Sequence, residues 1–136
     1  YCKPDLVHDI TNGFPMFKDG QMSEVIANGV LEMIQDNKDF IFVFNELWRI
    51  IRTGGHLIGQ VPSTDKRVLG LDFMDRRWFL PESFNYFNSS ENSWQQFGTQ
   101  YGICGWHILK NNINENGILC FDLVPDHEFG KPYNMI

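Results

Sequence analysis

A charged stretch between residues 63 and 78 holds the side chains best suited to binding a small polar molecule. It contains Asp72, Arg76 and Arg77, followed by the aromatic Trp78. The fork of an arginine side chain matches the two oxygens of a carboxylate or a phosphate. These residues are therefore candidates to bind a substrate. The competing interpretation is a charged loop that is simply solvated.

The cysteines and histidines do not form a familiar metal-binding or catalytic pattern. Cys104 and His107 could be grouped with Cys120 and His127, but this spacing is not a usual zinc pattern. We therefore predict no metal site and interpret the cysteines as buried thiols. The sequence also has no Ser/His/Asp nucleophile motif, phosphate-binding loop or redox Cys-x-x-Cys motif.

Composition favours one globular domain over residues 1–136, with a small neutral or cationic molecule as the ligand that suits its negative charge. Hydrophobic residues make up 43% of the chain and aromatic residues 15%, which is enough for a core. A net charge of -6 without a basic block argues against nucleic acid or an anionic membrane surface as partners. No apolar run approaches the ~20 residues of a membrane span. Three sparse cysteines favour a reducing compartment, which predicts a cytoplasmic protein.

One amphipathic helix and the strand after it are predicted to organise the fold. Apolar residues recur at helical spacing from Phe40 to Ile51, and Asp36 is a suitable N-cap. The helix is predicted to end in a glycine turn at 52–55, followed by a buried strand at 57–61. Helix, turn and buried strand form half of a βαβ unit. This predicts an α/β fold with a mostly parallel sheet.

The remaining segments are predicted from turn signals and short apolar runs. Asn-Gly at 116–117 is typical of a hairpin between two strands. The polar tail at 126–136 is predicted to be loosely held. The other predicted elements are an extended segment at 6–8, a strand at 23–27, a helix at 30–34, a helix beginning at Leu80-Pro81, a polar loop at 88–96, and the hairpin strands at 106–109 and 117–124.

In these residues the chain resembles the class I S-adenosylmethionine-dependent methyltransferases, in particular the methyltransferase type 11-like branch. The resemblance covers about the first two thirds of the chain, and its most specific part is Glu46, Arg49 and Gly54-Gly55 on the central helix and its turn. We interpret Glu46 and Arg49 as a structural ion pair, because i, i+3 side chains meet on a helix. The matching segments are 3–10, 14–15, 19–34, 45–55, 61–62 and 72–84.

The resemblance implies a Rossmann-like methyltransferase sheet with a C-terminal antiparallel hairpin and S-adenosylmethionine as cofactor. It places Asp9 where the family accepts the adenine amino group, with Ile10 beside it. It places Asn28 and Gly29 beside the methionine part of the cofactor. The alternatives from local structure are a turn-capping role for Asp9 and a plain helix cap at Asn28 and Gly29.

The family's glycine-rich loop and the acidic residue that ends its second strand have no counterpart in these 136 residues. The resemblance places both upstream of Tyr1, so we interpret the chain as a C-terminal portion whose N-terminal strands are missing. The strand at 23–27 would then expose one edge. We predict that it pairs with the segment at 6–8 or mediates homo-oligomer formation.

These features together predict an S-adenosylmethionine-dependent methyltransferase that acts on a small-molecule or sugar-type acceptor. The alternative is a methyltransferase-like module without catalytic activity, which acts by binding or association.

Overall fold

The computed structural model describes residues 3–63 and 77–132. Within them, four strands form one sheet in the order β1-β2-β4-β3. The strands are β1 (Met22–Asn28), β2 (Ile51–Pro62), β3 (Trp106–Ile113) and β4 (Ile118–Pro125), and the long helix is α1 (Asn37–Ile50). β1 and β2 are parallel, whereas β2–β4 and β3–β4 are antiparallel. The predicted α/β class and closing hairpin are confirmed, and the sheet is mixed.

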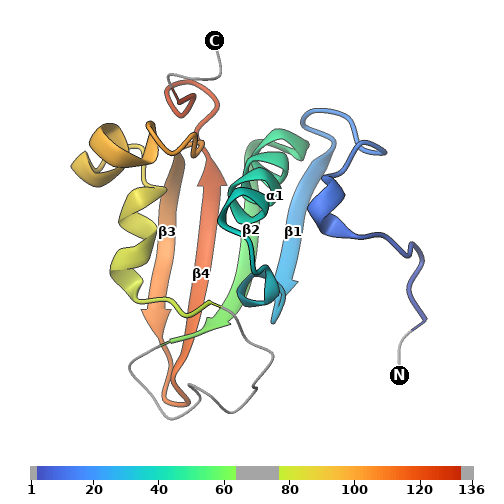
Figure 1. Cartoon of the computed structure of the whole chain (residues 1–136), viewed down its shortest axis with the longest axis horizontal. Coiled ribbons are helices and arrows are strands. Elements are labelled where there is room, and N and C mark those ends of the chain that lie inside the picture. Colours follow the sequence, from blue (N-terminus) through green and yellow to red (C-terminus); the bar gives the residue numbers. More distant parts are fainter. Residues whose placement is uncertain (1–2, 64–76, 133–136) are drawn as a thin grey trace.

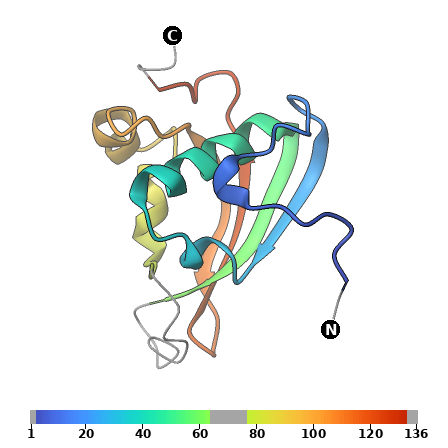
Figure 2. The same cartoon turned by 45° about the vertical axis from the view of Figure 1, so that its right-hand side comes forward.

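Helix α1 packs against one face of this sheet (Figures 1 and 2). Its buried residues follow the predicted apolar stripe, and Asp36 caps it by accepting from the backbone N–H groups of Lys38 and Asp39. Alternate residues of β2 and β4 supply the other half of the core, including Leu57, Leu119 and Leu123, which are fully buried. The helical turn Pro81–Tyr86 adds Phe84, whose ring lies 5.2 Å from that of Phe121 of β4.

The junction between α1 and β2 differs from the prediction. The helix ends at Ile50 and the strand begins at Ile51, so the glycine turn lies within the strand. Met22 of β1 pairs with Ile51 of β2, and Glu24 of β1 pairs with His56 of β2. More residues lie between these two pairs on β2 than on β1, and the extra residues form a bulge. Gly54 supports this bulge with a φ of 80°, which L side chains rarely adopt. Ile51 fits the apolar stripe of a helix and is buried as the first residue of β2, so periodicity alone could not locate the boundary.

The extended segment predicted at 6–8 is not part of any strand. Leu6 and Val7 are 55% and 87% exposed. A short extended segment gains hydrogen bonds only beside a neighbouring strand, and none lies beside it among the described residues. The prediction that it pairs with β1 is therefore wrong for this structure.

Other short predictions are corrected by tertiary packing. The helix predicted at 30–34 is a single 3-10 turn, Leu31–Met33. The polar loop at 88–96 contains the start of a helical turn, Trp94–Gly98, because Trp94 is buried and donates to the carbonyl of Ile103. Of the tail at 126–136, residues 126–132 are described: Asp126 and Pro132 are buried, Gly105 N–H donates to the carbonyl of Gly130, and Phe129 is 73% exposed, so a loosely held tail stays a prediction.

Candidate functional site

The parallel pairing of β1 and β2 brings their carboxyl ends to the same edge of the sheet. Ligands in open α/β folds bind beyond the carboxyl ends of such strands. After β1, the chain continues through Gly29 to the first turn of α1. Two cavities lie beside this first turn.

The first cavity, here called the acidic cavity, has a volume of about 570 Å³. It brings together Ile10 and Gly29, two of the predicted cofactor residues. Asp36 and Asp39 contribute carboxylates from the start of α1. Its complete lining is Ile10, Thr11, Gly29, Val30, Met33, Ile34, Gln35, Asp36 and Asp39.

The other two predicted cofactor residues lie next to this lining in sequence without forming part of it. Asp9 caps the turn Ile10–Asn12: its Oδ1 accepts from the backbone N–H of Thr11 at 3.0 Å and from the Thr11 hydroxyl at 2.7 Å. The Thr11 hydroxyl and N–H lower the pKa of Asp9. Asp9 therefore has the turn-capping role that local structure offered as the alternative to cofactor binding. Asn28 is exposed at the end of β1, and cofactor binding by either residue stays a prediction.

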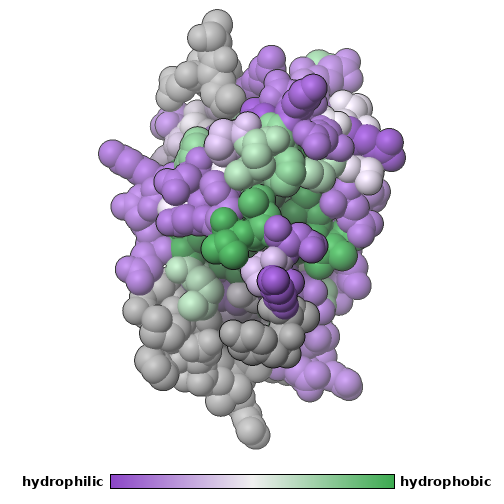
Figure 3. Space-filling model, turned by 90° about the vertical axis from the view of Figure 1, so that its right-hand side faces the viewer, coloured by the Kyte–Doolittle hydropathy of each residue, from purple (hydrophilic) through white to green (hydrophobic). Residues whose placement is uncertain are grey.

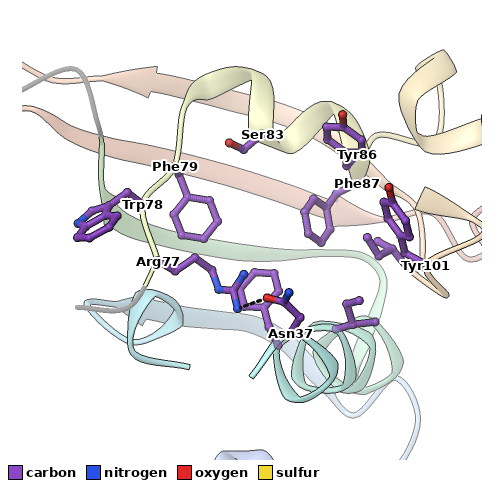
Figure 4. A pocket seen from close by; sticks show the side chains of 11 residues that line it. Asn37, Arg77, Trp78, Phe79, Ser83, Tyr86, Phe87 and Tyr101 are labelled. Atoms are coloured by element: carbon purple, nitrogen blue, oxygen red, sulfur yellow. Dashed lines mark hydrogen bonds between the residues drawn. The ribbon is translucent and has the colours of Figure 1, made fainter. Parts of the chain in front are cut away.

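The second cavity, here called the aromatic cavity, has a volume of about 540 Å³ (Figure 4). Two of the predicted substrate residues, Arg77 and Trp78, line it. The other two, Asp72 and Arg76, lie outside the described residues. Its complete lining is Asn37, Phe40, Ile41, Arg77, Trp78, Phe79, Ser83, Tyr86, Phe87, Tyr101 and Ile103.

Arg77 is held against α1 by its guanidinium. Nη2 donates to Asn37 Oδ1 at 3.0 Å and to the Ile34 carbonyl at 3.4 Å, and Cζ lies 4.2 Å from the centroid of the Phe40 ring. The buried Nε has no hydrogen-bond partner among the described residues. Burial lowers the pKa of Arg77, whereas the negative charge of Asp36 raises it to a smaller extent. Arginine nevertheless stays protonated at neutral pH.

Most residues of the aromatic cavity were not predicted from the sequence to bind a ligand. Phe40 was assigned to the core stripe, and Tyr86, Phe87 and Tyr101 were assigned no binding role. Tyr86 and Tyr101 are 42% and 56% exposed, and single exposed aromatic side chains are common on protein surfaces. The available signal was the 15% aromatic content, but it does not indicate which rings converge.

The Glu46–Arg49 ion pair is confirmed and lies apart from both cavity linings. Arg49 Nε donates to Glu46 Oε2 at 2.6 Å. The pair also binds the backbone of the loop before β1 through Phe14 and Phe17. The most specific residues of the resemblance therefore have a structural role here.

Residues 3–63 and 77–132 contain neither a cluster of metal-binding side chains nor a membrane-spanning helix. No group of three or more His, Cys, Asp or Glu side chains is placed to hold a metal ion. No helix in this part of the chain is long and apolar enough to cross a bilayer. The cytoplasmic location stays a prediction.

Comparison with known proteins gives matches only at the level of structure. No family model matches the sequence, and no curated protein does. A chain from the complex of the Haloferax volcanii Trm112 methyltransferase activator with a protein named as a methyltransferase matches at a TM-score of 0.61 and 14% identity. The match covers 93% of this chain and 65% of that one.

Two further solved structures match less closely. LaPhzM gives a TM-score of 0.55 at 15% identity, over 88% of this chain and 34% of its own. A SAM-dependent methyltransferase from Thermotoga maritima gives 0.50 at 11% identity, over 85% and 61%. The chain thus spans less than two thirds of each of these structures. At such identities the likeness concerns the fold, and this chain has a class I methyltransferase-like fold.

Proposed function

We propose that this chain is part of an S-adenosylmethionine-dependent methyltransferase that acts on a small-molecule or sugar-type acceptor. The observation that carries the proposal is the position of the two cavities on either side of one helical turn. Asp36 and Asp39 line the acidic cavity, whereas Asn37, Phe40 and Ile41 line the aromatic cavity. Ligands in the two cavities would be neighbours, and methyl transfer requires its reactants to be held close and aligned.

The lining of the acidic cavity is compatible with this cofactor. Ile10, Val30 and Met33 offer apolar surface to a flat adenine ring, and the carboxylates of Asp36 and Asp39 offer charge opposite to a sulfonium. Gly29, with no Cβ, leaves backbone accessible after β1. S-adenosylmethionine, when bound, supplies a methyl group on a positively charged sulfur. The protein's contribution is to exclude water and align the acceptor.

The aromatic cavity would hold the acceptor. The predicted substrate residues are Asp72, Arg76, Arg77 and Trp78, of which the last two lie in this lining. Arg77 would orient an acceptor through its guanidinium, and Trp78 would cover it.

Calorimetry with S-adenosylhomocysteine tests the cofactor assignment. We expect binding that is weakened at least about tenfold by Met33→Trp, because the indole fills the acidic cavity. Met16→Trp is the matched control, since Met16 is 42% exposed, Met33 is 38% exposed, and Met16 lies outside the lining. Equal affinities of the two variants would contradict the assignment. The titration is repeated on the native protein if its coding sequence extends upstream of Tyr1.

The second candidate function, a non-catalytic module that acts by association, is favoured by the exposed edge of β1. Among the described residues, β1 pairs with β2 alone. Its sequence contains neither lysine nor proline, the residues that commonly protect edge strands. Apolar surface gathers on the side of the molecule that carries β1 and the N-terminal segment (Figure 3), where Ile26 is 62% exposed.

Sedimentation velocity tests association through β1. We expect concentration-dependent self-association of the native chain that Ile26→Lys abolishes and Leu109→Lys, on the other edge strand, leaves intact. A monodisperse monomer would contradict association through β1. Absence of S-adenosylhomocysteine binding by both the chain and any longer native form would favour the non-catalytic module.

A further inference from the structure

We infer that the aromatic cavity selects a planar aromatic acceptor that carries an anionic group, rather than a sugar. This inference rests on the proposed function, because it names the acceptor class for that cavity. Its basis is the combination of a ring-lined surface with a single guanidinium.

The lining combines three rings that are almost fully buried, Phe40, Phe79 and Phe87, with three that are exposed. The ring centroids of Phe79 and Phe87 each lie 6.1 Å from that of Phe40. Trp78, Tyr86 and Tyr101 are 44%, 42% and 56% exposed, and Figure 4 shows them around these inner rings. Aromatic surfaces favour offset-stacked or edge-to-face contacts with another ring. A planar aromatic ligand would therefore contact the lining over most of its surface.

The polar groups of the lining are spread among aromatic rings, and two of them are already occupied within the protein. Ser83 Oγ accepts from the backbone N–H of Leu80 at 3.0 Å. Asn37 Oδ1 accepts from Arg77 at 3.0 Å. A sugar carries several hydroxyl groups, and leaving them without hydrogen bonds against apolar rings is unfavourable. The cavity thus matches a ligand with one polar end.

The charge of the lining determines the sign of that polar end. Arg77 is the single charged residue in the lining given by the described residues, although the whole chain carries a net charge of -6. Its Nη2 is used by Asn37 and Ile34, and its buried Nε has no partner among the described residues. A carboxylate in the cavity would be attracted by the charge of this guanidinium. Figure 4 shows the Arg77 side chain extending from beside Phe79 towards Asn37.

Binding of three naphthalene derivatives to the native chain tests the inference without cofactor. The probes are naphthoate, naphthalenemethanol and naphthylmethylammonium, which share one ring system and differ in charge, with methyl glucoside as the sugar probe. We expect naphthoate to bind at least about tenfold more tightly than the neutral alcohol, and the ammonium and the sugar to bind most weakly. Equal binding of the three naphthalenes, or tighter binding of the sugar, would overturn the inference.

Variants assign the preference to Arg77. Arg77→Met should abolish the difference between naphthoate and the alcohol, whereas Arg77→Lys should retain part of it because the charge remains. Arg52→Met is the control, since Arg52 is an exposed arginine outside the lining. A preference that survives in Arg77→Met would overturn the assignment. The comparison of probes on the native chain needs no variant, so it remains decisive even if a variant misfolds.

The two proposals fail separately. A chain that binds S-adenosylhomocysteine but shows no preference for naphthoate refutes this inference and leaves the proposed function standing. A chain that prefers naphthoate but binds no S-adenosylhomocysteine refutes the cofactor assignment and leaves the ligand class of the cavity standing.

Discussion

Glu46 and Arg49, one turn apart on helix α1, bind the two backbone groups of Phe14 between them. Glu46 Oε1 accepts from the Phe14 N–H at 2.9 Å, and Arg49 Nη2 donates to the Phe14 carbonyl at 2.9 Å. Arg49 Nη1 also donates to the Phe17 carbonyl at 3.0 Å and to Asp19 at 2.8 Å. The ion pair therefore fastens the loop before β1 to the central helix.

Loss of the Arg49 guanidinium should destabilise the fold. Arg49→Met leaves the carbonyls of Phe14 and Phe17 without these donors, and hydrogen bonds to charged groups contribute about 1.5–3 kcal/mol each. We expect the free energy of unfolding in urea to fall by about 2–3 kcal/mol. Lys38→Met, an exposed cation on the same helix, should change it by less than about 0.5 kcal/mol. Equal midpoints for the two variants would contradict this role.

The contribution of Glu46 should depend on pH. Its hydrogen bond with Arg49 holds the pKa of Glu46 below its ordinary value of 4.5. A depressed pKa means that the ionised carboxylate stabilises the fold above about pH 4.5, and that this stability is lost as pH falls through the lower folded pKa. The difference in unfolding free energy between the native protein and Glu46→Gln should therefore narrow in acid.

Urea titrations at a series of pH values between 7 and 3 measure this difference. Glu91→Gln is the control for general acid effects, because Glu91 is exposed. A deficit of Glu46→Gln that stays constant across the whole range would contradict the assignment.

Two glycines with similar backbone conformations should respond differently to alanine. A Cβ at Gly13, where φ is 72°, would lie 2.8 Å from both Glu46 Oε1 and the Phe42 ring, whereas a Cβ at Gly54, where φ is 80°, meets nothing within 4 Å. Both variants place a side chain at a positive φ, which L side chains rarely adopt. Gly13→Ala should lose at least about 1 kcal/mol more, because overpacking is added. Equal losses measured by thermal unfolding would show that the loop moves aside freely.

Truncation of the buried face of α1 should empty core volume. Leu47 and Trp48 are 4% and 6% exposed, and Trp48 Nε1 also donates to the Gly105 carbonyl at 2.9 Å. Leu47→Ala and Trp48→Ala should each reduce the free energy of unfolding by about 2–5 kcal/mol. Leu109→Ala is the matched control, because Leu109 is 60% exposed, and it should cost less than about 1 kcal/mol. Near-neutral urea midpoints for Leu47→Ala and Trp48→Ala would contradict the packing of this face.

Elements whose signals lie in residues close together in the chain could be predicted from the sequence alone. The apolar stripe and the Asp36 cap located α1, short apolar runs located β1 and the core part of β2, and Asn-Gly located the β3–β4 hairpin. Helical periodicity, capping and turn chemistry depend on residues only a few positions apart, so they can be read without knowing the fold. The i, i+3 pair of Glu46 and Arg49 belongs to the same class.

Strand pairing and cavities depend on residues that are far apart in the sequence, so they become visible only in the tertiary structure. Segment 6–8 has strand-like residues but no strand partner among those described, and Ile51, which fits the helical stripe in sequence, is the first residue of β2. The aromatic cavity is the clearest case, because Tyr86 and Tyr101 converge with Arg77 on the first turn of α1 from separate segments. A cavity is created where elements pack imperfectly against one another, and no local sequence signal encodes that geometry.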